Sequence, residues 1–304
     1  MFNYEYWGLG SFNAKVNMAL EEFLLKRAIT GIVPVRFWDF SKDSVVLGYG
    51  QATDAVKKRD STFDIVRRIT GGSHVQTGKN ILAYTFAVPR DGSFRHLEDM
   101  RAYFADVVAK SLEYLGIQNI EVDNKASTIM VDKKIIASHA MIWGIESALL
   151  HGLIIVDPYD VNEVFERVNL KRRKIGRNVY TEYNALKNLP AISQLLTNIA
   201  PNFNEEKRSE ILKEIIAKSI LKNLTNKYET KKITTSTIVE AFDVVNKKHK
   251  KIDWIENRKP PFTEEEIEKI PGEELDGTLK KNLGYCLFSQ VKNKDFKRMV
   301  ETEK

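Results

Sequence analysis

Cysteine is almost absent from this chain, because its 304 residues include one, Cys286. A single thiol excludes a disulfide framework within the chain and a zinc site built from several cysteines. No window approaches the ~20 apolar residues that a membrane-spanning helix needs. Met1 leads into Phe2–Trp7 without the basic start and apolar run of a signal peptide. Internal repeats and low-complexity tracts are missing too. We therefore expect a cytosolic protein with no metal site and no membrane contact.

The chain has enough apolar material for a packed core. Hydrophobic residues make up 43% and aromatic residues 10% of the sequence, a composition that argues against disorder. A chain of this length fits one large domain, or one domain with a small appendage. The net charge of +6, from 47 Lys and Arg against 41 Asp and Glu, is a modest excess. It suits anionic small molecules or acidic partner proteins as readily as nucleic acid.

Hydrophobic spacing predicts helices and strands that are interleaved without strict alternation. Helices are expected over 12–26, 96–115, 160–167, 191–199 and 205–223. Strands are expected over 35–40, 44–50, 63–70, 81–88, 127–131, 133–142 and 151–157. This pattern favours an α+β fold, a mixed β-sheet packed by helices, over a doubly wound parallel sheet. Lys, Thr and Asn become frequent after residue 225. We therefore expect a catalytic core over 1–225, and a linker with a short C-terminal appendage over 226–304.

The most informative segment is Arg67–Val75, where a strand carries two arginines into a Gly-Gly turn. Glycine lets the backbone approach a ligand closely, and successive amide N–H groups in such a turn can form an anion site. An adjacent guanidinium binds phosphate through two parallel hydrogen bonds. Taken alone, a plain β-turn explains this segment equally well.

Two further segments place a polar side chain at the end of an apolar strand. Lys134 follows a turn at Asp132 and Lys133, and a lysine in that place is more often a surface residue than a catalytic one. His151 and Gly152 open the strand over 151–157. On its own, His151 is more consistent with a hydrogen-bonded structural histidine.

Taken together, these segments resemble the lipoate–protein ligase A and octanoyltransferase family, whose catalytic domain is shared with biotin protein ligases. Arg67–Val75 resembles the family's Arg-Arg-x-Ser/Thr-Gly-Gly-Gly-Ala-Val loop. Asp132–Ile135 is similar to its lysine-bearing turn, and His151–Ile155 to its His-Gly-Thr-Leu-Leu strand. The other matches, in chain order, are 12–22 with the first helix, 45–51 with a strand ending in Gly-x-x-Gln, and 254–262 with a tryptophan-bearing segment. The resemblance covers about residues 5–262.

The resemblance implies an ATP-dependent lipoate–protein ligase. ATP with Mg²⁺ would activate lipoate to lipoyl-AMP beside a hydrophobic slot, and the lipoyl group would then pass to a lysine of a carrier protein. Lys134 takes the place of the family's essential lysine. The residues implied in nucleotide binding are Arg68, Gly71, Gly72, Ser73, His74, Val75, Gln76 and Lys134. The residues implied in acyl binding are Gly48, Arg68, Gly71, Gly72, Lys134, His151 and Gly152.

An acyltransferase that uses a carrier thioester as donor is the alternative. Octanoyltransferases of the family hold the acyl group on a cysteine nucleophile. The two windows where that cysteine falls, 123–127 and 167–170 here, contain none, so the ligase is favoured. The family's third loop glycine is Ser73 here, its alanine is His74, and a position that is usually histidine is Thr77. Nucleotide contacts or acyl preference can therefore differ.

The expected partner is a lipoyl-carrier protein, such as a 2-oxoacid dehydrogenase E2 subunit or the glycine-cleavage H protein. Many bacterial ligases carry a large C-terminal domain after the tryptophan segment, whereas a short stretch follows it here. A separate accessory subunit, as in some archaeal ligases, is therefore a second expected partner. A nucleic-acid-binding module built on the basic runs 171–174 and 247–251 is a remote alternative, because these runs lack the interleaved aromatics of single-strand binders.

Overall fold

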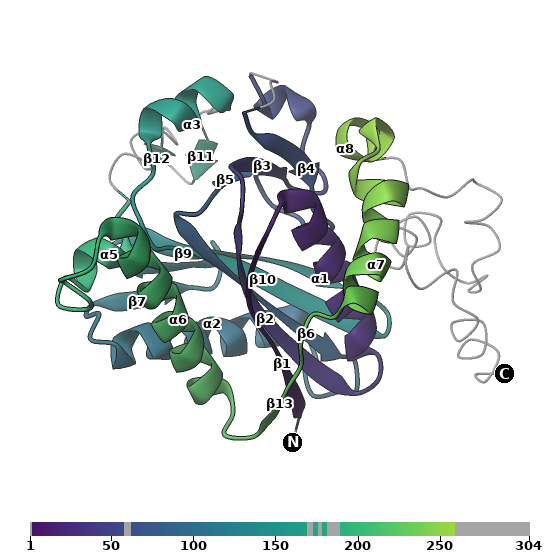
Figure 1. Ribbon diagram of the computed structural model, residues 1–304, viewed down its shortest axis with the longest axis horizontal. Helices are drawn as coiled ribbons and strands as arrows, with labels where there is room; N and C mark the ends of the chain where they lie inside the picture. Colours follow the sequence, from purple (N-terminus) through teal and green to yellow (C-terminus); the bar gives the residue numbers. More distant parts are fainter. Residues whose placement is uncertain (1, 58–61, 169–172, 176–177, 181–188, 259–304) are drawn as a thin grey trace, which may run out of the picture.

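An eight-stranded mixed β-sheet forms the centre of the molecule (Figure 1). The computed structural model describes residues 2–57, 62–168, 173–175, 178–180 and 189–258. The strand order is β13-β1-β2-β6-β10-β9-β8-β7. The strands are β13 (Tyr228–Thr230), β1 (Asn3–Phe12), β2 (Ile32–Phe40), β6 (Ile81–Pro89), β10 (Ser147–Ile155), β9 (Lys134–Trp143), β8 (Thr128–Val131) and β7 (Ile120–Asp123). The β13–β1 and β1–β2 pairs are parallel and the others are antiparallel.

Helix α1 (Ala14–Ala28) covers one face of this sheet together with a second, smaller sheet. Asn13 caps the helix by accepting a hydrogen bond from the Val16 amide at 3.0 Å, as expected from the predicted start of the helix near this residue. The smaller sheet has the order β4-β3-β5. Its strands are β4 (Asp64–Arg67), β3 (Ser44–Leu47) and β5 (Val75–Thr77). Met18 of α1 packs with Trp38, Val46 and Val66 between the two sheets.

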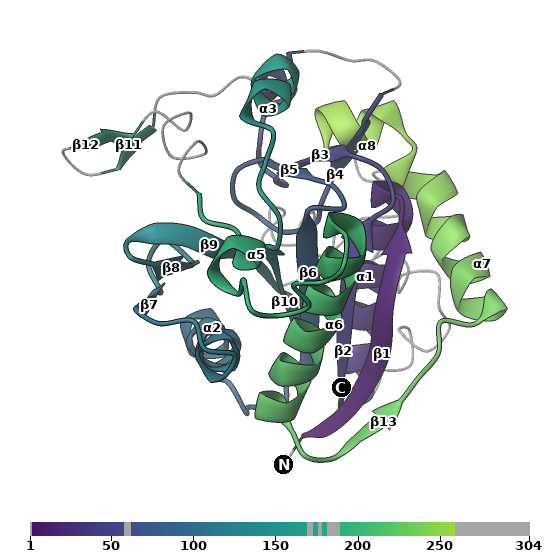
Figure 2. The ribbon, with the colours of Figure 1, turned by 60° about the vertical axis from the view of Figure 1, so that its left-hand side comes forward.

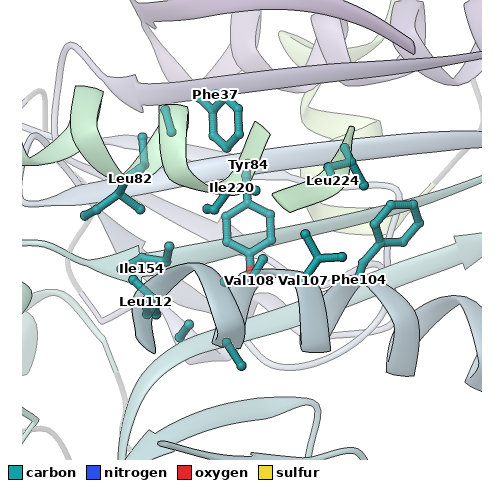
Figure 3. Close-up of a cluster of buried hydrophobic side chains, with 14 of the residues drawn as sticks. Phe37, Leu82, Tyr84, Phe104, Val107, Val108, Leu112, Ile154, Ile220 and Leu224 are labelled. Carbon is teal, nitrogen blue, oxygen red and sulfur yellow. The ribbon is translucent and has the colours of Figure 1, made fainter. Parts of the chain in front are cut away.

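Two long helices, α2 (Leu97–Tyr114) and α6 (Glu205–Leu224), cover the opposite face. Figure 3 shows Phe104 and Val108 of α2 and Ile220 of α6 directed toward Phe37 and Tyr84 of the sheet. These side chains are buried, and apolar burial of this kind is the main favourable term in folding. The α+β arrangement predicted from the sequence is confirmed.

The remaining elements are short. They are α3 (Val161–Arg167), α5 (Ile192–Leu195), the 3₁₀ turn Thr53–Ala55 and the two-stranded sheet of β11 (Arg173–Ile175) and β12 (Asn178–Tyr180). Two strands end earlier than predicted. Strand β3 ends at Leu47 and not at residue 50, and β4 ends at Arg67 and not at residue 70. The residues that follow form a turn and a loop. None of the helices in the described ranges is long and apolar enough to span a membrane.

The chain after residue 225 continues the same packed body. Strand β13 lies beside β1 at one edge of the sheet (Figure 2). Helix α7 (Thr235–Val244), a π-helical turn (Val245–His249) and α8 (Ile252–Asn257) follow, and α7 packs on α1. The packed body therefore runs past the predicted boundary at residue 225 to at least Asn257. Residues 259–304, most of the predicted appendage, lie outside the described residues.

Part of the basic run 247–251 is buried by this packing. The Lys248 ammonium and His249 Nε2 each lie 2.8 Å from Oε1 of Glu22, and all three side chains are fully buried. Lys248 also lies over the ring of Trp254, at 4.2 Å from its centroid. Both side chains therefore lie in the interior and do not form part of a basic outer surface.

Candidate active site

A cavity of about 520 Å³ lies against the α1 side of the main sheet. Most of its walls are apolar and come from α1, both sheets and their connections: Met18, Trp38, Phe40, Val46, Val75, Ile81, Ala83 and Leu153. The polar lining residues and glycines include Arg68, Gly71, Gly72, Ser73, Thr77, Ser127, Ser138, His139 and His151. An apolar slot with a few convergent polar groups is typical of a small-molecule site.

Arg68 holds the loop that forms one wall of the cavity. It is 4% exposed, and its Nη2 donates to the carbonyl oxygens of Gly71 at 2.6 Å and Ser73 at 2.7 Å. Its Nη1 donates to the Val46 carbonyl at 3.2 Å and its Nε to Thr70 Oγ1 at 2.9 Å. Burial lowers the pKa of Arg68 to about 10, so the guanidinium stays charged at neutral pH. Four of its five N–H groups are thus used within the protein, three on residues 70–73 and one on β3, and its predicted contact with phosphate stays a prediction.

Gly48 and Gly72 allow this loop to cross the end of β3. A Cβ atom added at Gly48 would lie 1.9 Å from the Gly72 carbonyl oxygen, far inside any allowed contact. Gly72 itself has φ +91°, a conformation that favours glycine. The two glycines therefore serve a close backbone crossing, and Gly48 lies behind the loop and not in the cavity wall.

Arg67 points to the other side of the strand, because successive residues alternate. It is buried, and burial lowers its pKa to about 10. Its Nη1 donates to three carbonyls of one turn, those of Gly48 (2.8 Å), Tyr49 (2.9 Å) and Gln51 (2.7 Å). The Gln51 amide nitrogen lies 2.6 Å from Nδ1 of His74. Arg67 therefore orders the turn that supports the outer end of the loop.

A buried network beneath the loop links His151 to α1. His151 Nε2 lies 2.7 Å from Thr70 Oγ1, and its Nδ1 lies 2.6 Å from Oε1 of Glu21. Thr85 donates to the same carboxylate oxygen at 3.0 Å. Because Thr70 Oγ1 already accepts from Arg68, its own proton can be directed at His151. Glu21 belongs to the segment 12–22, which resembles the family's first helix. That resemblance did not show that the Glu21 carboxylate binds His151.

Gly152 is required by a ring on the neighbouring strand. A Cβ atom there would lie 2.3 Å from the hydroxyl and Cζ of Tyr84, because the two residues are register partners in β10 and β6. The glycine after His151 therefore makes room for an aromatic side chain in the sheet, in addition to lining the cavity.

Lys134 begins β9 directly after a two-residue turn. Asp132 and Lys133 both have positive φ, +47° and +62°, as a type I′ hairpin turn requires. Lys134 pairs with Val131, whose side chain belongs to the core on the α2 side. Directly opposed residues share a face, so Lys134 leaves the strand away from most of the cavity wall. Its side chain is exposed, while the adjacent Ile135 lines the cavity.

The structure thus brings part of the predicted site together. Arg68, Gly71, Gly72, Ser73, Val75, His151 and Gly152 line the cavity. Gly48, His74, Gln76 and Lys134 are not among its lining residues. His74 and Gln76 have supporting contacts instead, since Gln51 meets His74 and the Gln76 carbonyl accepts from the Tyr159 hydroxyl at 2.8 Å. The roles of Lys134 and of the loop residues in binding remain predictions.

The partly buried imidazole of His139, which lines the cavity, is expected to make the protein sensitive to acid. Burial, with smaller contributions from His151 and Arg101, lowers the pKa of His139 from 6.5 to about 4. The unfolded chain therefore binds a proton before the folded chain does. Stability is full above pH 6.5 and falls as the pH drops toward 4. Between pH 7 and pH 5 this group should cost about 2 kcal/mol of unfolding free energy.

The measurement is urea unfolding of the wild type and of His139→Gln at both pH values. We expect His139→Gln to lose about 2 kcal/mol less than the wild type over this interval. Equal losses in the two proteins would show that His139 titrates normally in the folded state.

Comparison with known proteins places this site in context. The lipoyl protein ligase A/B catalytic domain model matches residues 13–216. Lipoate–protein ligase 1 of Staphylococcus aureus is 25% identical over 262 residues, which cover 84% of this chain and 74% of that protein. The crystal structure of a lipoate–protein ligase A bound with ATP has a TM-score of 0.65 at 17% identity, covering 84% of this chain and 98% of that one. A bipartite lipoate–protein ligase of Thermoplasma acidophilum, studied with its E2 lipoyl domain, has a TM-score of 0.66 at 16% identity, with 84% and 96% covered.

Proposed function

Because the chain belongs to the lipoyl protein ligase A/B catalytic domain family, we propose that it is a lipoate–protein ligase. It activates lipoate with ATP to lipoyl-AMP and transfers the lipoyl group to a specific lysine of a carrier protein. The observation that carries this proposal is the apolar cavity whose wall includes the glycine loop held by Arg68. The similarity to the Staphylococcus aureus ligase supports the same assignment.

The cavity suits the two ends of an acyl-adenylate. The apolar side chains of Met18, Trp38 and Leu153 can contain the carbon chain and keep water from the reacting carbonyl. Gly71–Ser73 line the same cavity, and we propose that their backbone amides donate to the phosphate oxygens. Donors fixed before the reaction stabilise developing charge without reorganisation, and Arg68 is what fixes this loop. Mg²⁺ would enter with ATP as its counter-ion.

Lys134 is proposed to supply the mobile cation of the reaction. Its side chain is exposed at the start of β9 and leaves the strand on the face opposite to that of Ile135, which lines the cavity. Within the described part of the chain its ammonium makes no hydrogen bond or ion pair, so it is free to turn toward a bound acyl carboxylate and α-phosphate. It would neutralise charge during adenylation and again when the carrier amine attacks.

The transferase alternative lacks its nucleophile. A family transferase needs a cysteine near the acyl carbonyl, and the chain has its single cysteine at position 286, far from the matched segments. We therefore place ATP-dependent activation ahead of transfer from a carrier thioester.

The carrier is proposed to be a lipoyl-domain protein, such as a 2-oxoacid dehydrogenase E2 subunit or the glycine-cleavage H protein. The structural likeness to one component of a bipartite ligase supports, at the level of the fold, an accessory subunit as a further partner. The predicted cytosolic location stays a prediction.

Mass spectrometry of apo-carrier proteins tests the function. The enzyme is incubated with lipoate, Mg²⁺ and ATP, and each component is omitted in turn. We expect a mass increase of one lipoyl group on a single lysine, which disappears without ATP. A mass increase from octanoyl-carrier in the absence of ATP would support the transferase instead. If neither appears, the assay is repeated with candidate accessory subunits, and failure there would refute the proposal.

A further inference from the structure

The C-terminal helix α8 is joined to the strand that precedes the glycine loop. Trp254 is 1% exposed, and its Nε1 donates to the backbone carbonyl of Arg67 at 3.0 Å. In return, Nε of Arg67 donates to the carbonyl of Ile255 at 2.8 Å. Two hydrogen bonds in opposite directions therefore connect α8 to β4. Their partners are separated in the sequence by 187 and 188 positions.

The same arginine extends this connection to the loop. Its Nη1 holds the carbonyls of Gly48, Tyr49 and Gln51, and Gln51 meets His74 at 2.6 Å. The Tyr49 ring also lies near the Trp254 ring, with 6.1 Å between centroids. A continuous set of contacts thus runs from α8 through Arg67 and the 48–51 turn to the outer end of the loop.

Helix α8 is itself held in place on α1. Trp254 packs with the buried side chains of Trp7, Leu24 and Leu25, and Lys248 lies over its ring while binding Glu22. A helix fixed in this way can define the position of what it touches.

We propose that α8 is a part of the nucleotide site and that Trp254 is a positioning residue: through Arg67 it fixes the 48–51 turn and the loop 71–76 in the conformation that binds ATP. This inference rests on the proposed function and adds a role for a segment outside the matched range 13–216. Removal of the indole N–H leaves the Arg67 carbonyl without its donor, and the loop samples conformations in which its amides diverge.

The test uses Trp254→Phe, which keeps an aromatic ring and removes the donor. One buried hydrogen bond corresponds to about a 5-fold change in an equilibrium. We therefore expect the KM for ATP to rise about 5-fold while the KM for lipoate stays within 2-fold of the wild type. Amide hydrogen exchange in residues 48–51 and 71–76 should become faster in the variant, and this second reading does not depend on ligase activity.

Two control variants separate positioning from general destabilisation. Val244→Ala removes buried packing in α7 without touching Arg67, and Ile252→Ala changes a residue of α8 that is 68% exposed. Both should keep the wild-type KM for ATP. Unchanged KM and exchange in Trp254→Phe, or the same changes in Val244→Ala, would overturn the inference. Absence of lipoylation by the wild type itself would instead refute the proposed function, and the hydrogen-exchange result would then decide whether Trp254 positions the turn and the loop.

Discussion

Replacement of Lys134 with alanine is expected to leave the fold intact and to reduce lipoyl transfer by at least 10²–10³-fold, by analogy with the loss of one oxyanion donor. The fold should survive because the side chain is exposed and makes no hydrogen bond or ion pair within the described residues. Activity should fall because the developing charges on the acyl carbonyl and the phosphate would then lack a mobile cation. The measurement is kcat/KM for lipoylation of the apo-carrier, with circular dichroism as the check on folding.

Lys133→Ala provides a matched control. Lys133 is the preceding residue, is also exposed, and lies in the same turn. It carries the same charge, so a general loss of positive potential at the hairpin would affect both variants alike. We expect Lys133→Ala to retain activity within a few-fold of the wild type, as surface substitutions usually do. Full activity in Lys134→Ala would remove Lys134 from the mechanism.

Gly48→Ala is expected to have the second largest effect. The added Cβ would lie 1.9 Å from the Gly72 carbonyl oxygen, so either the end of β3 or the loop must move. Overpacking of this kind costs about 1–3 kcal/mol of stability. A displacement of about 1 Å in a positioning element can reduce a rate about 10²-fold. We therefore expect lipoyl transfer to fall about 10²-fold or more, with a lower thermal midpoint.

Gly50→Ala isolates the steric cause of this effect. Gly50 belongs to the same turn, but a Cβ there would meet nothing within 4 Å and its φ lies outside the left-handed region. This variant should remain close to the wild type in both activity and thermal midpoint. Similar losses in Gly48→Ala and Gly50→Ala would indicate that the turn tolerates no side chain at all, and that the close crossing is not the reason.

Local patterns predicted the elements whose determinants are local. The first helix was placed by Asn13 and by apolar spacing, and α6 was predicted over 205–223 and observed over Glu205–Leu224. Strand β1 was not predicted. Its sequence NYEYWGLGSF contains two glycines, and a register shift between Tyr6 and Leu9 interrupts its regular pairing with β2. Its alternation is therefore weak.

The sequence predicted the glycine loop of the site, but it did not predict the residues that hold the loop and His151 in place. The Gly-Gly turn was visible in the sequence, and period-2 alternation could have shown that Arg67 and Arg68 point to opposite sides. The partner of His151 could not be found from local patterns, because Glu21 lies 130 residues away. The exposed position of Lys134 depends on the β8–β9 register, which a family motif does not contain.

The C-terminal elements were missed for a compositional reason. The segment 225–251 is rich in Lys and Thr and resembles a solvated linker, yet Lys248 and His249 are buried. Pairing with Glu22, which is distant in the sequence, makes that burial tolerable. A local sequence pattern does not predict such a pair.

The buried group of Glu22, Lys248 and His249 also bears on the order in which the chain folds during synthesis. Lys248, whose ammonium neutralises the carboxylate, and His249, which also contacts it, follow Glu22 by 226 and 227 residues, so they emerge roughly 10 to 45 s after α1 at common rates of translation. Until these residues arrive, Glu22 lacks the partners that offset the cost of burying its charge. The segment after Val244 is therefore expected to close over α1 as a late step of folding, after the helix and the sheet have been synthesised.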